Sequence, residues 1–244
     1  MPANPDRSQP SGKALTPLRI TRFDLVQRVA HWANAVLFGI LMLTALPLYF
    51  SLVERLVGRH LLIAEIHLWA GVALPVPLVV SVLGPWGARM RRDMRRISRW
   101  TEDEVRWLWH LGRNAPQITD KFNPAQKLNA IFVAGAIVVM LGTGLILKWF
   151  NVFPVNWREG ATFVHEVLAF AIFIVVIGHI GFALTHRDAL RSIVRGWVPE
   201  AWARKHAPRW LQEEREGVAL SRRKSVRSVE SRADATADLR GDLP

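Results

Sequence analysis

The sequence contains no cysteine among its 244 residues. This absence excludes disulfide bonds, iron–sulfur clusters held by cysteine thiolates, and haem attached covalently through a Cys-x-x-Cys-His motif. The chain also lacks a glycine-rich nucleotide-binding loop and a molybdopterin site. Any metal centre must therefore use histidine, methionine or carboxylate ligands, and we expect no substrate-oxidising active site in this chain.

Acidic residues are scarce relative to basic ones. The chain has 32 Lys and Arg against 20 Asp and Glu, which gives a formal net charge of +12. Such a charge favours either nucleic acid or an anionic membrane surface as a partner. No recognised nucleic-acid-binding motif accompanies the charge, so we expect a lipid bilayer and no nucleic acid.

Four long apolar blocks lack the polar stripe that a soluble helix of the same length would show. They cover about residues 24–50, 61–84, 127–150 and 161–185. A bilayer core of about 30 Å needs about 20 apolar helical residues to cross it. The sequence therefore predicts an all-α fold, an integral membrane four-helix bundle. Pro75 and Pro77 predict a kink in the second half of the second span.

The segments outside the blocks are polar. We expect residues 1–21 to be a flexible cytoplasmic tail, residues 22–212 to form the membrane domain, and residues 213–244 to be a disordered basic cytoplasmic tail. The connection 85–127 combines arginines at helical spacing with several tryptophans. It fits one or two interfacial helices, although an ordinary solvated basic loop fits equally well. An apolar stripe beside arginines predicts another interfacial helix after the fourth span.

The distribution of positive charge predicts the orientation of the spans. Of the 32 Lys and Arg residues, only Arg55, Arg59, Lys148 and Arg158 lie in the two short loops or at the end of the third span. All others lie in the N-terminal segment up to Arg28, in the long connection 85–127 or after the fourth span, on one side of the membrane. By the positive-inside rule, we expect a multi-pass protein of the cell inner (plasma) membrane with both termini in the cytoplasm.

Four of the eight histidines lie inside the apolar spans, namely His31, His67, His165 and His179. A polar ring in hydrocarbon is costly and indicates a function. A single such histidine could simply hydrogen-bond a neighbouring helix. The four, however, fall at two depths, with His31 level with His179 near the cytoplasmic side and His67 level with His165 near the outer side.

The spacing along the fourth span supports a pair of haem sites. His165 and His179 are fourteen positions apart, so they project within about 40° of each other and stand about 21 Å apart along the helix axis. Two imidazoles on opposite axial sites make a low-spin haem that transfers electrons. We therefore predict a transmembrane di-haem cytochrome b with two b haems. Arg28, Arg59 and Arg158 are candidates for the haem propionates, or else ordinary snorkelling arginines.

Several motifs resemble the gamma subunit of membrane-bound, quinone-linked formate dehydrogenase, a di-haem cytochrome b556 related to Ni–Fe hydrogenase cytochrome b subunits and prokaryotic cytochrome b561. The resemblance covers roughly residues 20–212. Its carriers are Arg28-Val-Ala-His31-Trp32, Ile66-His67-Leu-Trp-Ala-Gly71, Lys121-Phe-Asn-Pro-Ala-Gln-Lys127, the His165 and His179 pair, Gly196-Trp-Val198 and His206-Ala-Pro-Arg-Trp210.

The resemblance implies the same ligand pairing, His31 with His179 in the inner haem and His67 with His165 in the outer haem. It also implies a quinone site near the inner haem at Asn123, Gln126 and Lys127. The family's Ala-Gly pair is replaced here by Pro124-Ala125, so a contact that needs glycine is in doubt. Asn123 followed by proline also fits a helix N-cap, and both roles can coexist.

The resemblance further implies a membrane anchor that passes electrons from an iron–sulfur beta subunit through two haems to menaquinone or ubiquinone. Formate oxidation would belong to a catalytic alpha subunit. Within this class, the cytochrome subunit of a hydrogenase, of a thiosulfate or sulfite enzyme, or of another b561-like oxidoreductase remains an alternative. A haem-free membrane scaffold or transporter is the alternative from another class.

Overall fold

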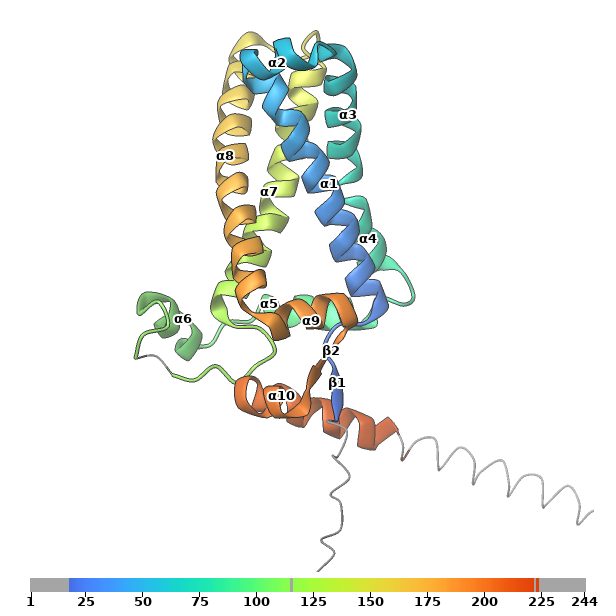
Figure 1. The fold of residues 1–244 in the computed structure, drawn as a ribbon, viewed down its shortest axis with the longest axis vertical. Helices are drawn as coiled ribbons and strands as arrows, with labels where there is room; N and C mark the ends of the chain where they lie inside the picture. Colours follow the sequence, from blue (N-terminus) through green and yellow to red (C-terminus); the bar gives the residue numbers. More distant parts are fainter. Residues whose placement is uncertain (1–17, 115, 222, 224–244) are drawn as a thin grey trace, which may run out of the picture.

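The computed structural model describes residues 18–114, 116–221 and 223. Most of this part of the chain is helical, which confirms the all-α membrane bundle (Figure 1). Four helical segments are long and apolar enough to cross a membrane, Leu25–Tyr49, His60–Leu83, Pro124–Lys148 and Val155–Thr185. The first, third and fourth are the helices α1, α7 and α8. The chain is thus a multi-pass membrane protein.

The second span is broken near its middle. It consists of α3 (His60–Ala73) and α4 (Val76–Leu83), joined at Leu74 and Pro75. Proline has no backbone N–H, and its ring clashes with the carbonyl four residues earlier, so the regular hydrogen bonding of a helix stops there. The interruption lies where the two prolines predict a kink.

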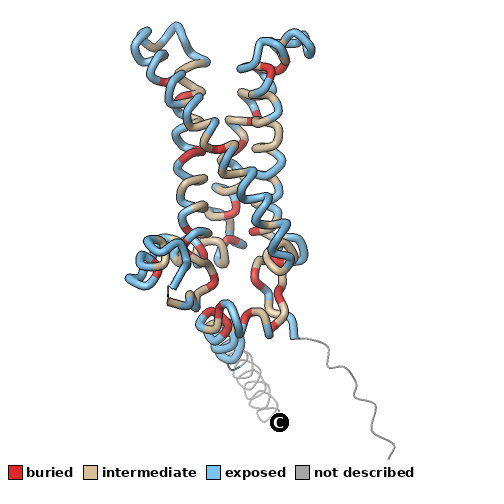
Figure 2. The backbone as a smooth tube through the Cα atoms, turned by 60° about the vertical axis from the view of Figure 1, so that its left-hand side comes forward, coloured by how far each residue is buried: buried red, intermediate tan, exposed pale blue. Residues whose placement is uncertain are grey.

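The four spans form two helical hairpins. α1 packs along α3 and α4, and α7 packs along α8, whereas the two hairpins meet mainly where α3 approaches α7. Figure 2 shows the two arms diverging towards the end that carries α2 (Ser51–Val57). Side chains in the space between the hairpins therefore face side chains of the opposite hairpin.

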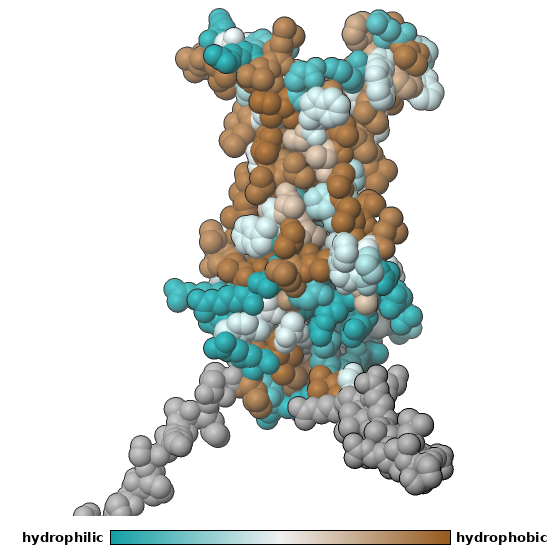
Figure 3. Space-filling model, turned by 90° about the vertical axis from the view of Figure 1, so that its right-hand side faces the viewer, coloured by the Kyte–Doolittle hydropathy of each residue, from teal (hydrophilic) through white to brown (hydrophobic). Residues whose placement is uncertain are grey.

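On the face that Figure 3 shows, an apolar band covers the middle of the molecule, with polar zones at both ends. The spans expose many large apolar side chains, including Leu43, Val138, Phe163 and Phe170. Such surface is unfavourable in water but matches a lipid environment.

Short elements gather at the other end into what we call the polar base (Figure 1). Its elements are β1 (Arg19–Thr21), α5 (Ala88–Ile97), α6 (Glu102–Trp109), α9 (Arg187–Arg195), β2 (Trp197–Pro199) and α10 (Glu200–His206). The connection between the second and third spans thus contains helices rather than an unstructured loop.

The strands β1 and β2 join the two ends of the membrane domain. They are antiparallel, with Ile20 opposite Val198, and the turn before β2 requires Gly196. Its φ is +86°, and a Cβ atom there would lie 2.8 Å from the Phe23 carbonyl oxygen. Because β1 precedes α1 and β2 follows α8 and α9, this ladder brings the start of the first span to the end of the fourth.

The domain boundaries differ from those expected at both ends. Residues 19–21, expected in a flexible tail, form β1, and residues 208–221 are helical, although 213–244 were expected to be disordered. Trp210 and Leu211 on this helix pack with Val198, Ala203 and Ala207 in a buried apolar cluster. The rest of both predicted tails lies outside the described residues.

Candidate haem sites and their surroundings

The four intramembrane histidines meet as two pairs across the two hairpins. The ring centroids of His31 on α1 and His179 on α8 are 6.2 Å apart, and those of His67 on α3 and His165 on α8 are 6.4 Å apart. The planes of the rings are inclined by 56° and 59°. The structure therefore brings together the same residues that their depths paired.

The spacing within each pair fits one metal atom between two imidazoles. A metal–nitrogen bond to histidine is about 2.0–2.1 Å, and the ring centroid lies about 1 Å behind the nitrogen. Two rings on opposite sides of one metal are thus expected about 6 Å apart, close to both observed distances. Direct stacking would bring the rings closer, as in Phe182 and His186 at 3.8 Å.

Two histidines per site suit a haem better than a bare ion. A protein-bound metal ion needs three or four protein ligands, and within the described residues no group of three or more His, Cys, Asp or Glu converges on one point. A haem iron takes four nitrogens from its porphyrin and needs only two axial ligands. The donor set therefore fits a b-type haem at each pair.

Unpaired polar atoms lie near both pairs. Arg28 Nε, Asn34 Oδ1 and Arg158 Nε are buried without a hydrogen-bond partner in the described part of the chain. Arg28 and Asn34 lie one turn before and after His31, and Arg158 lies two turns before His165. A buried polar group without a partner is unfavourable, so the two arginines fit a role towards an anionic group such as a propionate. Arg59, in contrast, is exposed at the start of α3.

Arg28 also has a structural contact. Its guanidinium donates to the Val194 carbonyl at 2.8 Å and lies against Gly196, where a Cβ atom would approach Arg28 Nε to 3.2 Å. Trp32 Nε1 likewise donates to the Ile193 carbonyl at 3.4 Å. These contacts hold the His31 end of α1 against the end of α9.

Asn123 and Gln126 form a capping box at the start of α7. Asn123 Oδ1 accepts from the Gln126 backbone N–H at 2.8 Å, and Gln126 Oε1 accepts from the Asn123 N–H at 3.1 Å. Both residues thus act as a helix cap. The cap uses only the amide oxygens, so both side-chain NH₂ groups remain outside it.

Lys127 lies in the interior of the polar base. It is 2% exposed, and its ammonium group contacts Glu104 Oε1 at 2.6 Å and donates to the Arg99 carbonyl at 2.8 Å. Glu104 also completes a capping box with Thr101 at the start of α6. The ion pair therefore fastens α6 to the first turn of α7.

A second buried lysine, the first residue of the Lys121–Lys127 motif, lies beside α1 and had no role assigned to it from the sequence. Lys121 Nζ donates to Asp93 Oδ2, and Gln27 Nε2 donates to the same oxygen at 2.6 Å. Arg22 donates to the Lys121 carbonyl at 2.9 Å. Burial lowers the pKa of Lys121 to about 8, against the opposing influence of the Asp93 carboxylate. Burial also lowers the pKa of Arg22, to about 10.

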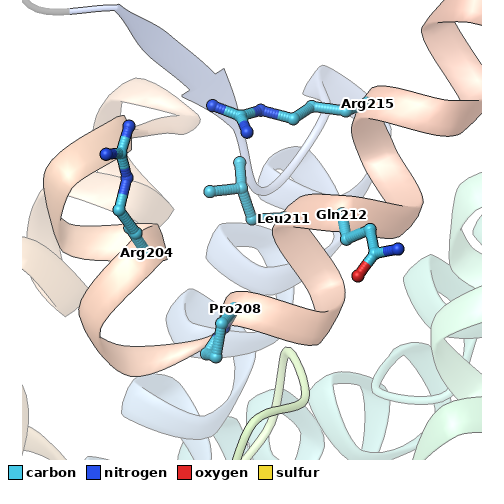
Figure 4. A pocket seen from close by; sticks show the side chains of 5 residues that line it. All are labelled: Arg204, Pro208, Leu211, Gln212 and Arg215. Carbon is cyan, nitrogen blue, oxygen red and sulfur yellow. The ribbon is translucent and has the colours of Figure 1, made fainter.

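A pocket of about 470 Å³ opens at the far side of the polar base, remote from the histidines. It is lined by Arg204, Pro208, Leu211, Gln212 and Arg215 (Figure 4). Arg204 and Arg215 both pair with Glu200. Glu200 therefore contacts both guanidinium groups, so each arginine of this pocket already has an acidic partner.

Sequence reasoning also missed two threonines. Thr44 on α1 and Thr143 on α7 each hydrogen-bond Nδ1 of one outer-pair histidine, His67 and His165, at 2.8 Å. A signal was present in the spacing. Each threonine lies in the span before its histidine, at separations of 23 and 22 residues.

The fold and the paired histidines define a class, the helical membrane proteins that present imidazole pairs between their spans. The model of one such family, the prokaryotic cytochrome b561 family, matches residues 22–196, so the chain belongs to this family. The chain is therefore a membrane cytochrome b.

Curated relatives are all formate dehydrogenase subunits by name. The chain is 28% identical to the formate dehydrogenase cytochrome b556 subunit of Haemophilus influenzae, over 80% of this chain and 84% of the relative. It is 26% identical to the cytochrome b556(fdo) subunit of Escherichia coli, with 80% and 93% covered. Identity to the nitrate-inducible b556(Fdn) subunit of the same organism is 23%, with 80% and 91% covered.

Proposed function

We propose that this chain is the membrane-anchoring di-haem cytochrome b subunit of a respiratory formate dehydrogenase. The observation that carries the proposal is the presence of two cross-hairpin histidine pairs with ring centroids 6.2 and 6.4 Å apart. His31 and His179 would hold the inner haem, and His67 and His165 would hold the outer haem. Arg28 and Arg158, and Arg59 at the outer surface, are the propionate partners.

Bound b haems supply one-electron transfer between the two membrane surfaces. The residues of this chain hold them in register. α8 contributes one ligand to each site, so a single helix sets the separation of the two centres, and α1 and α3 contribute the second ligands.

Quinone reduction belongs next to the inner pair in this proposal. Asn123 and Gln126 begin α7 at the polar base, and His31 and His179 form the histidine pair on the side of the bundle that faces this base. Their free amide NH₂ groups suit the carbonyl oxygens of menaquinone or ubiquinone. Lys127 holds this segment through its ion pair with Glu104.

The partners follow from the same function. An iron–sulfur beta subunit docks at the outer surface and delivers electrons, and a catalytic alpha subunit oxidises formate, since this chain has no cysteine for clusters of its own. The names of the three relatives support formate as the partner's substrate. The charge bias supports the inner membrane with both termini in the cytoplasm.

A haem assay on variants tests the ligand assignment. A pyridine haemochrome assay on the purified protein should give about two b haems per chain. His67→Ala and His165→Ala should each remove the outer haem and retain the inner one, whereas His31→Ala and His179→Ala should do the reverse. His110→Ala, at an exposed histidine outside the pairs, is the matched control and should retain both haems.

The result that overturns the assignment is one haem or none in the unmodified protein, or His67→Ala and His165→Ala losing different haems. Purification from native membranes tests the complex. Co-purified subunits that reduce the haems with formate support a formate dehydrogenase, whereas reduction by hydrogen, sulfite or thiosulfate supports the related oxidoreductases.

A further inference from the structure

The two histidines of the outer pair share an arrangement that the inner pair lacks. Thr44 Oγ1 lies 2.8 Å from His67 Nδ1, and Thr143 Oγ1 lies 2.8 Å from His165 Nδ1. In both hairpins the hydroxyl comes from the first helix and the imidazole from the second. The same threonine–imidazole contact therefore occurs twice, once in each hairpin.

The hydroxyl hydrogens are committed elsewhere. Thr44 Oγ1 donates to the Ile40 carbonyl at 2.7 Å, and Thr143 Oγ1 donates to the Val139 carbonyl at 2.8 Å. A hydroxyl has one hydrogen to donate and two lone pairs that accept. With its hydrogen directed to the carbonyl, each threonine oxygen accepts from the imidazole, and Nδ1 of both histidines then carries the proton.

This hydrogen bond fixes the tautomer of each ring. With Nδ1 protonated, Nε2 of His67 and of His165 has a free lone pair, as an axial ligand requires. A hydrogen bond from the non-ligating nitrogen also makes an imidazole a stronger donor to its metal. The backbone carbonyl behind each hydroxyl strengthens this effect, because the hydrogen bonds form a chain.

The inner pair is different. In the described chain, neither His31 nor His179 has a hydrogen-bond acceptor at its ring, and the aromatic neighbour of His31 is Trp32, edge to face at 5.6 Å. The two sites therefore have the same histidine ligands, but only the imidazoles of the outer pair have a hydrogen-bond acceptor. Stronger donors favour ferric over ferrous iron, and hydrogen bonding to the axial ligands is one of the means by which proteins tune haem potentials.

We propose that Thr44 and Thr143 are positioning residues that lower the reduction potential of the outer haem below that of the inner haem. The inference rests on the proposed haem ligands and deepens that function, because it names the residues that make the potentials of the two haems unequal. Electrons that enter at the outer pair then move downhill to the inner pair and the quinone.

The test replaces each hydroxyl without changing the shape of its side chain. Thr44→Val and Thr143→Val should keep two haems and raise the midpoint potential of the outer haem, with the double variant showing the larger shift. Loss of one such hydrogen bond should change the ferric–ferrous equilibrium constant by up to about tenfold, which is about 59 mV for one electron. The inner haem should not change.

Two sets of controls isolate the hydrogen bond. Thr44→Ser and Thr143→Ser retain a hydroxyl and should keep the wild-type potential. Thr162→Val removes a hydroxyl on α8 that also bonds back to a carbonyl, that of Arg158 at 2.9 Å, but is bonded to no imidazole. It should leave both potentials unchanged.

Redox titration with optical and electron paramagnetic resonance detection gives the potentials, and the haemochrome assay gives the haem content. An unshifted outer haem in the valine variants overturns the proposal, as does an equal shift in Thr162→Val. If a valine variant loses its haem, the reduction potentials of the two haems in the wild-type protein provide the test. An outer haem with a higher potential than the inner haem overturns the proposal. A wild-type protein without two haems instead overturns the proposed function itself.

Discussion

The membrane bundle and the polar base contain opposite kinds of interior. In the base, charged side chains such as Lys121, Lys127 and Asp93 are almost completely buried, next to an apolar cluster around Trp210. In the bundle, large apolar side chains are exposed and the polar histidines face inward, towards one another. The base is a packed protein core. The bundle instead presents apolar side chains outward, as a lipid environment favours, and histidine pairs inward.

This difference assigns different sources of stability to the two regions. The base holds itself together through the β1–β2 ladder and ion pairs such as Lys127 with Glu104. The two hairpins of the bundle touch over a small area, so we expect the proposed haems between them to contribute much of their cohesion. Four predictions follow from this contrast, and the first has the largest expected effect.

Removal of haem should loosen the bundle and spare the base. A ligand at about 1,000 times its dissociation constant stabilises by about 4 kcal/mol, so the two proposed haems, each at that excess, would contribute about 8 kcal/mol. In protein produced without haem and held in detergent, hydrogen exchange should accelerate around Thr44, His67 and Thr143. Exchange around Val198 and Trp210 should remain slow. Equal acceleration in both regions would show that the base has no stability of its own.

Breaking the buried ion pair should damage the base and spare the haem sites. Lys127→Met leaves Glu104 charged and buried, which typically costs about 3–5 kcal/mol. Thermal unfolding should show this loss while both haem spectra stay unchanged. The double variant Lys127→Met with Glu104→Gln removes the unpaired charge of residue 104 and should recover part of the lost stability. No recovery would mean that packing of the lysine stem dominates.

The titration of Lys121 should appear in the pH dependence of stability. Its folded pKa of about 8 lies below the unfolded value of about 10.4, so the unfolded chain binds more protons between these values. Stability contributed by this group is therefore reduced below about pH 8 and rises by about 1 kcal/mol between pH 7 and 9.

The measurement is the free energy of unfolding of the wild type relative to Lys121→Met at several pH values. Asp93, Arg22 and Glu214 are the charged groups that influence Lys121. The methionine variant keeps all three and loses only the titrating ammonium, so the difference between the two proteins should grow with pH over this interval. A constant difference would place the pKa of Lys121 near its ordinary value.

The bundle was predictable from the sequence to a far greater degree than the base. Apolar blocks and the fourteen-residue spacing of His165 and His179 are local patterns, and they suffice to predict the spans and to pair the histidines by depth. The Asp93–Lys121 contact and the β1–β2 ladder join segments far apart in the chain. A charged residue looks the same in sequence whether it is solvated or buried in an ion pair, so these features left no local signal.

The smallest expected effect concerns Asn123, where the base meets the proposed quinone site. Its oxygen caps α7, whereas a quinone would need its NH₂ group, and substitutions separate the two roles. Asn123→Ser keeps a capping oxygen and loses the amide donor. Its thermal stability should stay near that of the wild type, while oxidation of the reduced haems by quinone slows and the affinity for a quinone-analogue inhibitor falls by up to about tenfold.

Asn123→Ala loses both groups and should show the same kinetic defect together with about 1 kcal/mol lower stability. Gln126→Glu, which retains the oxygen of its capping box, is the parallel case at the third position of α7. All three variants should keep two haems. If Asn123→Ser reacts with quinone as fast as the wild type and only Asn123→Ala is less stable, then Asn123 belongs wholly to the base as a helix cap, and the quinone site lies elsewhere.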